Sequence, residues 1–133
     1  MRVLVPVRYP LTENSRRTVE RALELRRRGD EAVDLVFMHV NLFQNEEKAT
    51  RRELRREIEE MFDVSDASYS VRKGFLVEEA ILEEAATQEA DVIVIGRTRS
   101  GRLRKALRRL MRNDPDIENF LRENLDVRIE VAG

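Results

Sequence analysis

Apolar runs that alternate with amphipathic segments along the whole chain constrain its fold more than any other feature. Two of these runs, VDLVFMHV and DVIVI, are almost continuous in apolar residues. Strands buried on both faces of a parallel sheet have this pattern, because helices cover both sides. With three further β-branched or mixed runs, the sequence predicts strands over residues 2–7, 33–40, 67–72, 91–95 and 127–131.

The segments between the expected strands have the spacing of helices that bury one face. Leu54, Ile58 and Met61 fall on one side of a segment whose other residues are mostly charged. Helices are therefore expected from residue 14 or 15 to residue 29, and over residues 46–62, 76–90, 102–112 and 115–124. Strict alternation of strands and helices implies right-handed crossovers and a three-layer α/β sandwich, with helices on both faces of a parallel sheet.

The length of 133 residues is near the commonest domain size, and the chain shows no repeat or linker. We therefore expect a single domain over residues 1–133. The apolar N-terminal run is interrupted by Pro6 and Arg8, which does not suit an export signal. No stretch has the roughly 18–20 apolar residues of a membrane span. The expected location is the cytoplasm, with no membrane partner.

Residue types that carry common enzyme chemistry are scarce. The chain has no cysteine, which excludes disulfides and thiolate zinc sites. Its one histidine, His39, lies in an apolar run and is expected to be a core or strand-end residue. The paired glutamates are expected to be helix faces rather than acid–base pairs. No metal site and no catalytic set is predicted, so the protein is not expected to be an enzyme.

Positive charge is concentrated in one segment. Lys and Arg number 25 against 26 Asp and Glu, but residues 97–112 hold eight basic residues and no acidic one. One side of the molecule should therefore be positive on an otherwise acidic body, which favours an anionic ligand or partner. The simpler alternative is the solvated face of an amphipathic helix.

Ligands of open parallel sheets bind at the carboxyl ends of the strands, where neighbouring connections diverge to opposite faces. Two expected loops reach that edge: residues 6–10 after the first strand and residues 96–101 after the fourth. Arg8 in the first loop and Arg97 and Arg99 in the second would bind an anion through guanidinium groups in place of backbone amides. In the alternative interpretation these arginines are solvated surface residues.

Three stretches resemble the universal stress protein family: VLVPV at residues 3–7, MHV at residues 38–40, and GFLVEEAILEEAATQEADVIVIGRTRSGRL at residues 74–103. The resemblance covers almost the whole chain. It implies a five-stranded parallel sheet of order 3-2-1-4-5 and, often, dimerisation through the last strand. For many members it also implies ATP binding, with adenine against the backbone after the first and second strands.

Part of the family's nucleotide-binding pattern is present. Pro6 and Val7 match the end of the first strand, and Val40 matches the position near the base. Ile95 and Gly96 match the start of a phosphate loop after the fourth strand. In the family this loop reads G-x-x-G, nine residues, then G-[S/T]. Its glycines let backbone N–H groups approach phosphate oxygens.

The other positions depart from the pattern. Arg99 stands where the second glycine is expected, and residues 109–110 read Arg-Leu in place of G-[S/T]. With a short insertion the equivalent turn would fall at residues 113–115, where Asp114 would repel phosphate. Arg8 replaces the acidic residue that holds the ribose. We therefore expect no ATP binding of the usual kind.

The leading hypothesis is a non-enzymatic stress-response interaction or regulatory module without a cofactor. One alternative is an adenine-nucleotide switch for ATP, ADP or AMP, in which Arg8 and Arg99 compensate for the lost glycines. A second alternative is nucleic-acid binding by the basic helix expected over residues 102–112. In the simplest interpretation, Gly96 only ends a strand and Gly101 only shapes a turn before a helix. The candidate residues for nucleotide or anion binding are Pro6, Val7, Arg8, Val40, Ile95, Gly96, Arg97, Thr98, Arg99 and Gly101.

The last expected strand has a self-complementary edge. Val127, Ile129 and Val131 share one face, and Arg128 and Glu130 share the other. When two copies pair antiparallel about a twofold axis at Ile129, Arg128 of each copy lies opposite Glu130 of the other. We expect a homodimer through this edge, in which apolar burial sets the affinity and the ion pairs set the register.

Overall fold

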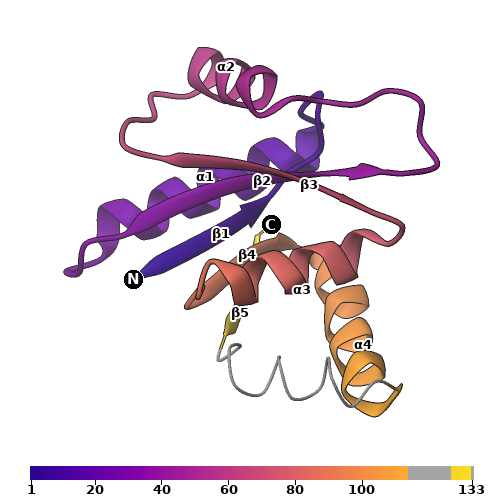
Figure 1. The fold of residues 1–133 in the computed structure, drawn as a ribbon. Coiled ribbons are helices and arrows are strands. Elements are labelled where there is room, and N and C mark those ends of the chain that lie inside the picture. Colours follow the sequence, from indigo (N-terminus) through magenta and orange to yellow (C-terminus); the bar gives the residue numbers. More distant parts are fainter. Residues whose placement is uncertain (114–126, 133) are drawn as a thin grey trace.

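A parallel sheet forms the centre of the computed structural model, which describes residues 1–113 and 127–132 (Figure 1). Its five strands lie in the order β3-β2-β1-β4-β5, and all neighbouring strands are parallel. This confirms the predicted topology. The strand positions agree with the sequence to within one or two residues: β1 (Arg2–Pro6), β2 (Asp34–Leu42), β3 (Ser68–Gly74), β4 (Val92–Gly96) and β5 (Arg128–Ala132).

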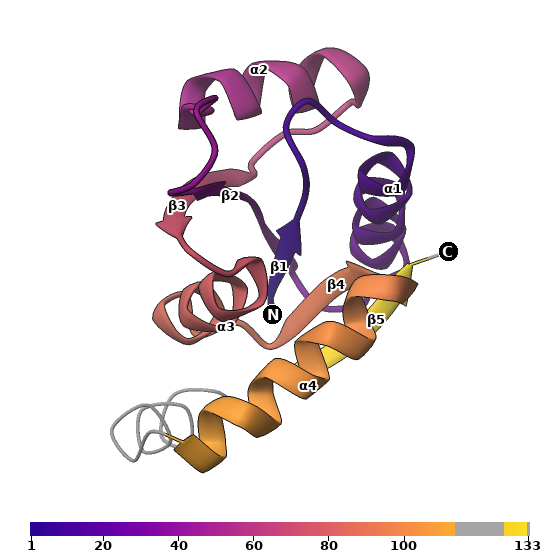
Figure 2. The same cartoon turned by 90° about the vertical axis from the view of Figure 1, so that its right-hand side faces the viewer.

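Helices cover both faces of the sheet, which gives the three layers expected from the alternating pattern (Figures 1 and 2). α1 (Glu13–Arg28) and α2 (Arg51–Met61) pack on one face, whereas α3 (Val77–Thr87) and α4 (Arg97–Asn113) pack on the other. Central strands are therefore buried on both sides. In β1, Val3 and Val5 belong to the core under α1 and α2, and Leu4 belongs to the core under α3 and α4.

Side-chain caps set where the first two helices begin. Thr12 caps α1 by accepting a hydrogen bond from the Ser15 amide, so the helix begins earlier than residue 14 or 15. α2 begins at Arg51, after a capping box between Thr50 and Glu53, and not at residue 46. The segment before it is held outside the helix by two hydrogen bonds between the buried Asn41 side chain and the Ala49 backbone.

The start of α4 corrects a second expectation. The sequence predicts a loop over residues 96–101, but α4 begins at Arg97, directly after the last residue of β4. Gly101 is an exposed residue inside this helix and does not shape a turn before it. The helix extends to Arg97 because Ser100, Leu103 and Ala106 are all buried at helical spacing. The expected helix over residues 115–124 lies outside the described residues.

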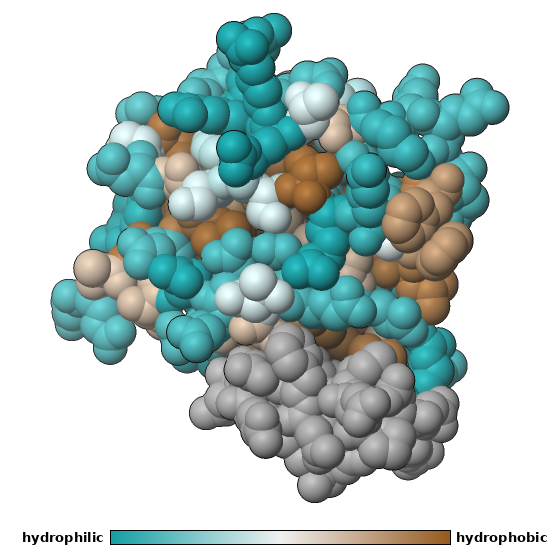
Figure 3. All heavy atoms as spheres, viewed as in Figure 1, coloured by the Kyte–Doolittle hydropathy of each residue, from teal (hydrophilic) through white to brown (hydrophobic). Residues whose placement is uncertain are grey.

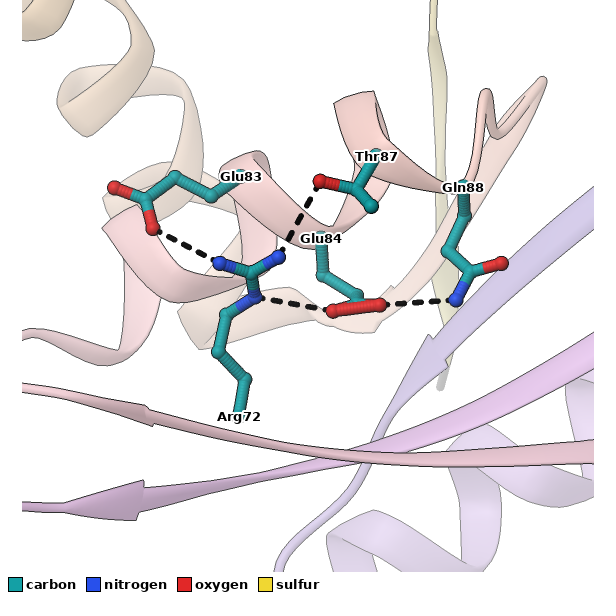
Figure 4. A network of polar contacts seen from close by, with 5 residues as sticks. All are labelled: Arg72, Glu83, Glu84, Thr87 and Gln88. Atoms are coloured by element: carbon teal, nitrogen blue, oxygen red, sulfur yellow. Dashed lines mark hydrogen bonds and ion pairs between the residues drawn. The ribbon is translucent and has the colours of Figure 1, made fainter.

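A buried carboxylate lies between β3 and α3 (Figure 4). Glu84 is only 5% exposed and accepts a hydrogen bond of 3.0 Å from Arg72 Nε. The same guanidinium donates to Glu83 at 3.3 Å and to Thr87 at 3.3 Å, and Gln88 donates to the other Glu84 oxygen at 2.9 Å. Glu84 thus lies on the buried face of α3 and fixes this helix to an edge strand.

The surface in the view of Figure 1 is mainly hydrophilic, with apolar atoms gathered at a few places (Figure 3). Among the described residues, the large apolar side chains that remain exposed are Phe43, Met61, Phe75 and Leu76. No helix in the described part of the chain has the length and apolar character that crossing a membrane requires.

Candidate functional site

A crevice of about 710 Å³ opens at the carboxyl ends of β1, β2 and β4. This is the edge at which parallel α/β sheets bind ligands. The chain segment after β1 and the first turn of α4 form its two sides. Nine of the ten candidate residues line it, namely Pro6, Val7, Arg8, Val40, Ile95, Gly96, Arg97, Thr98 and Arg99. Gly101 does not line it, because it faces solvent from within α4.

The wall of the crevice is cationic. Among the described residues, its lining contains no carboxylate and five arginines, namely Arg8, Arg17, Arg97, Arg99 and Arg102. Arg17 pairs with Glu13 at 2.8 Å and Arg99 with Glu78 at 3.2 Å. The described residues provide no carboxylate partner for Arg8, Arg97 or Arg102. Positive charge therefore gathers in a concave site, where low-dielectric walls strengthen its attraction for an anion.

Arg99 is the most enclosed of these arginines. Burial lowers the pKa of its guanidinium group, Glu78 raises that pKa, and the positive charges of Arg8 and Arg102 lower it again. Arg8 and Arg99 follow different strands, yet both line the crevice. A bound anion would relieve the repulsion between them, and this is the physical basis for treating them as a ligand site.

The end of α4 that faces the crevice is also positive. Its first turn contains Arg97 and Arg99 and no acidic residue, so the side chains add to the positive end of the helix dipole instead of offsetting it. Because the helix begins directly after Gly96, no glycine-rich loop is available to wrap a triphosphate with backbone amides. Anion binding here would depend mainly on guanidinium groups.

Hydrogen bonds from two helices hold the segment after β1 in place. The Arg8 amide donates to Ser15 Oγ of α1 at 2.9 Å, which places Arg8 beside the α1 cap. On the other side, Tyr9 Oη donates to Glu53 at 3.4 Å and the Leu11 amide donates to Glu57 at 3.2 Å, both from α2. Thr12 and Ser15 also line the crevice and were not among the predicted site residues, although their capping pattern directly after the first strand was an available signal.

His39 also lines the crevice. The sequence predicted only a core or strand-end residue at this position. Its Nδ1 atom lies 3.2 Å from the Tyr9 amide nitrogen and 3.2 Å from the Val7 carbonyl oxygen. Burial lowers the pKa of His39, and the contacts with Val7 and Asn41 raise it. The neutral ring can accept the hydrogen bond from Tyr9, so His39 supports the segment that carries Arg8. Among the described residues, no group of three or more His, Asp or Glu side chains is placed to hold a metal ion.

The expected dimer edge is the outer strand of the described sheet. Val127 and Ile129 pack against the core under α3 and α4, as their shared face implies. Glu130 accepts a hydrogen bond from Arg21 of α1 in the same chain. One member of the proposed intermolecular ion pair is therefore already engaged within the protomer, whereas Arg128 is exposed.

Comparisons with known proteins agree with this architecture. No protein-family model matches the sequence, and no curated protein matches it either. Among solved structures, the chain is similar to a universal stress protein in complex with cAMP, with a TM-score of 0.60 and 13% identity over 100% of this chain and 96% of the other. It is also similar to the hypothetical protein MJ0577, with a TM-score of 0.54 and 14% identity over 98% and 94%.

The chain therefore has the fold of the universal stress proteins, as its sequence resemblance implies. The likeness in fold extends over almost the whole of both chains.

Proposed function

We propose that the protein is a non-enzymatic regulatory module whose crevice binds a nucleotide through arginine side chains, and not ATP through a glycine-rich loop. The observation that carries the proposal is a crevice wall to which the described part of the chain contributes five arginines and no carboxylate. The likeness in fold to a universal stress protein in complex with cAMP supports a nucleotide as the anion.

The proposed roles follow from where each side chain lies. Arg97, Arg99 and Arg102 would hold phosphate oxygens by charge-assisted hydrogen bonds, in which a guanidinium group presents two parallel donors. Val7 and Val40, at the ends of β1 and β2, would provide an apolar surface for the base. Arginine side chains can reach phosphate without a close backbone approach, so Arg99 in place of glycine would not prevent binding.

The absence of turnover is also a proposal. Among the described residues, the crevice lining contains no carboxylate that could act as a general base, and Nδ1 of its one imidazole accepts a hydrogen bond from the Tyr9 amide. A bound nucleotide would then act by stabilising one arrangement of the segment after β1 and the start of α4. We propose that this regulates a partner in a stress response in the cytoplasm, and that the protein acts as a homodimer through β5.

A thermal-shift panel tests the proposed function, with AMP, cAMP, ATP and inorganic phosphate as probes. A ligand at 100 times its dissociation constant adds about 2.7 kcal/mol to the free energy of unfolding. We expect a clear shift with AMP or cAMP that Arg97→Gln weakens strongly. Arg104→Gln, a matched change on the exposed face of α4, should leave the shift intact.

Two outcomes would contradict the proposed function. If ATP co-purifies with the protein and binds equally well to Arg97→Gln, the arginines do not hold the phosphates. If the purified protein hydrolyses AMP, cAMP or ATP, it is not a purely binding module.

A second candidate function is nucleic-acid binding by the outer face of α4. Arg104, Lys105 and Arg108 are exposed there at helical spacing. Such a stripe attracts the phosphates of a nucleic acid without sequence preference, and the binding weakens as salt is added. Retention of DNA or RNA that salt abolishes, and that is lost in Arg104→Glu with Arg108→Glu, would favour this function over the crevice.

A further inference from the structure

Of the four exposed large apolar side chains among the described residues, three lie together at the ends of β2 and β3. Phe43 is 50% exposed, Phe75 is 70% exposed and Leu76 is 45% exposed. The two phenylalanine rings contact each other, with their centroids 4.6 Å apart and their planes tilted by 49°. Apolar atoms gather on the right-hand side of Figure 3, where the ends of β2 and β3 lie in Figure 1. We call these three residues the aromatic rim.

Hydrogen bonds hold the aromatic rim in place. The Phe43 amide donates to the Gly74 carbonyl at 2.9 Å, which continues the pairing of β2 with β3 beyond the strand ends. Gln44 Nε2 donates to the Phe75 carbonyl at 3.2 Å. The backbone that carries both exposed rings is therefore held in place, and the rings pack against each other. A prearranged apolar surface of this kind loses little conformational entropy when a ligand covers it.

The residues of the aromatic rim adjoin, along the chain, residues that line the crevice. Leu42 and Asn45, on either side of Phe43 in the sequence, line the crevice, and so does Val77, which follows Leu76 directly. Arginines lie at the other end, at the start of α4 beside β4. Because β3 and β4 are separated by β2 and β1, the ends of these two strands lie about 14 Å apart.

We propose that the crevice and the aromatic rim together bind a dinucleotide, with its phosphates on the arginines, one base in the crevice and the second base on Phe43 and Phe75. This inference rests on the proposed function and specifies its ligand class. A base has a flat π-face that stacks on an exposed aromatic ring. The rim provides such a ring at the end of the crevice that is farthest from the positive charge.

Charge complementarity supports a ligand with more than one phosphate. Arg8, Arg97 and Arg102 have no carboxylate partner among the described residues, and Arg99 is shared with Glu78. One phosphodiester carries a single negative charge, which is less than these groups can balance. The linear dinucleotide pApA has a terminal phosphate and a phosphodiester as well as two bases, so it matches both ends of the site.

Isothermal titration calorimetry with pApA and with AMP tests the proposal. We expect wild-type protein to bind pApA about tenfold more tightly than AMP, because stacking of the second base adds affinity. Phe75→Ala should remove that advantage and leave AMP affinity unchanged. Phe75→Leu keeps an apolar side chain but lacks a π-face, so it should also lose most of the advantage. Met61→Ala, which truncates an exposed apolar residue on α2 that does not line the crevice, should change neither affinity.

Each other outcome overturns the proposal in a distinguishable way. If AMP and pApA bind equally well to the wild type, the second subsite does not exist, although the proposed function stands. If a six-residue oligoadenylate binds much more tightly than pApA, the surface serves single-stranded nucleic acid. If neither AMP nor pApA binds, the proposed function fails together with this inference. Because both rings are exposed, replacing Phe75 is not expected to unfold the protein. The melting temperature of each variant checks that it folds.

Discussion

Arg99 Nη1 lies 3.2 Å from Glu78 Oε1, and this ion pair joins the first turn of α4 to the first turn of α3 at the mouth of the crevice. Both side chains are largely buried. Further along the same helices, Arg109 pairs with Glu79 at 3.4 Å. The arginine that replaces the expected glycine is thus held by a neighbouring helix, which keeps its charge at the edge of the site.

Glu78→Gln should increase the affinity of the crevice for AMP by about threefold, because it removes a negative charge that competes with the ligand for Arg99. Calorimetric titration at low ionic strength measures the change. Glu79→Gln is the matched control, because Arg109 does not line the crevice. Weaker binding by Glu78→Gln would instead show that Glu78 acts chiefly by orienting Arg99.

His39 should make the stability of the protein depend on pH. Burial lowers the pKa of His39 below its ordinary value of 6.5, so the unfolded chain takes up a proton at a higher pH than the folded chain. The contribution of neutral His39 to the free energy of unfolding is fully present above pH 6.5. It is lost as the pH falls through 6.5, and the loss levels off below the folded pKa.

Urea denaturation of wild type and of His39→Gln at pH 8 and at pH 5 isolates this contribution, because carboxylates titrate in both proteins. The difference in stability between the two proteins should shrink at pH 5. Since the chain has one histidine, its single imidazole NMR signal reports the folded pKa directly. A measured pKa above 6.5 would contradict the prediction.

Gly101→Ala should raise the free energy of unfolding by about 0.5–1 kcal/mol, because glycine inside a helix loses more backbone entropy on folding than alanine. A Cβ atom at residue 101 would meet nothing within 4 Å. Thermal or urea denaturation measures the gain, and nucleotide affinity should not change. Gly29→Ala is the control. Gly29 lies beyond the end of α1, and its added Cβ would come within 3.3 Å of the Leu25 carbonyl oxygen. A loss of stability in Gly101→Ala would show that residues 96–101 form a loop after all.

Glu89→Gly should stabilise the protein by about 1 kcal/mol. Glu89 has a φ of 53°, in the left-handed region that disfavours residues with a Cβ. The Glu89 amide donates to Ala86 and the Ala90 amide donates to Ala85, which is the hydrogen-bond pattern of a helix end that favours glycine. This turn also ends α3 at Thr87, earlier than residue 90. Glu89→Ala is the control in urea denaturation, since it removes the carboxylate but keeps the Cβ. An equal gain from Glu89→Ala would rule out backbone strain as the cause.

Arg128→Glu should weaken the proposed homodimer, because Arg128 is exposed and has no ion-pair partner among the described residues. Glu130→Arg is not expected to restore it, since the new arginine would lie against Arg21 of α1. Light scattering over a range of concentrations measures the association, with Arg104→Glu as a control for the change in net charge. A wild-type protein that is monomeric at micromolar concentration would contradict the dimer itself.

The apolar runs by themselves determined the strands and the layers. A segment such as DVIVI can bury both of its faces only in the middle of a covered sheet, so local pattern is enough to place it. The ligand edge followed in turn, because parallel strands that alternate with helices end on the same side. The resemblance to a family then added the strand order, which the structure confirms.

Tertiary structure decided the features that depend on contacts between distant segments. Helical periodicity over residues 97–106 is interrupted by Gly101, and only the burial of Ser100, Leu103 and Ala106 against the rest of the protein shows that the helix begins at Arg97. Glu130 meets Arg21 across more than one hundred residues. Phe43 and Phe75 meet because two strand ends lie side by side. A continuous apolar run carries the information for its own burial, whereas a residue's choice of partner depends on which segments the finished fold brings together.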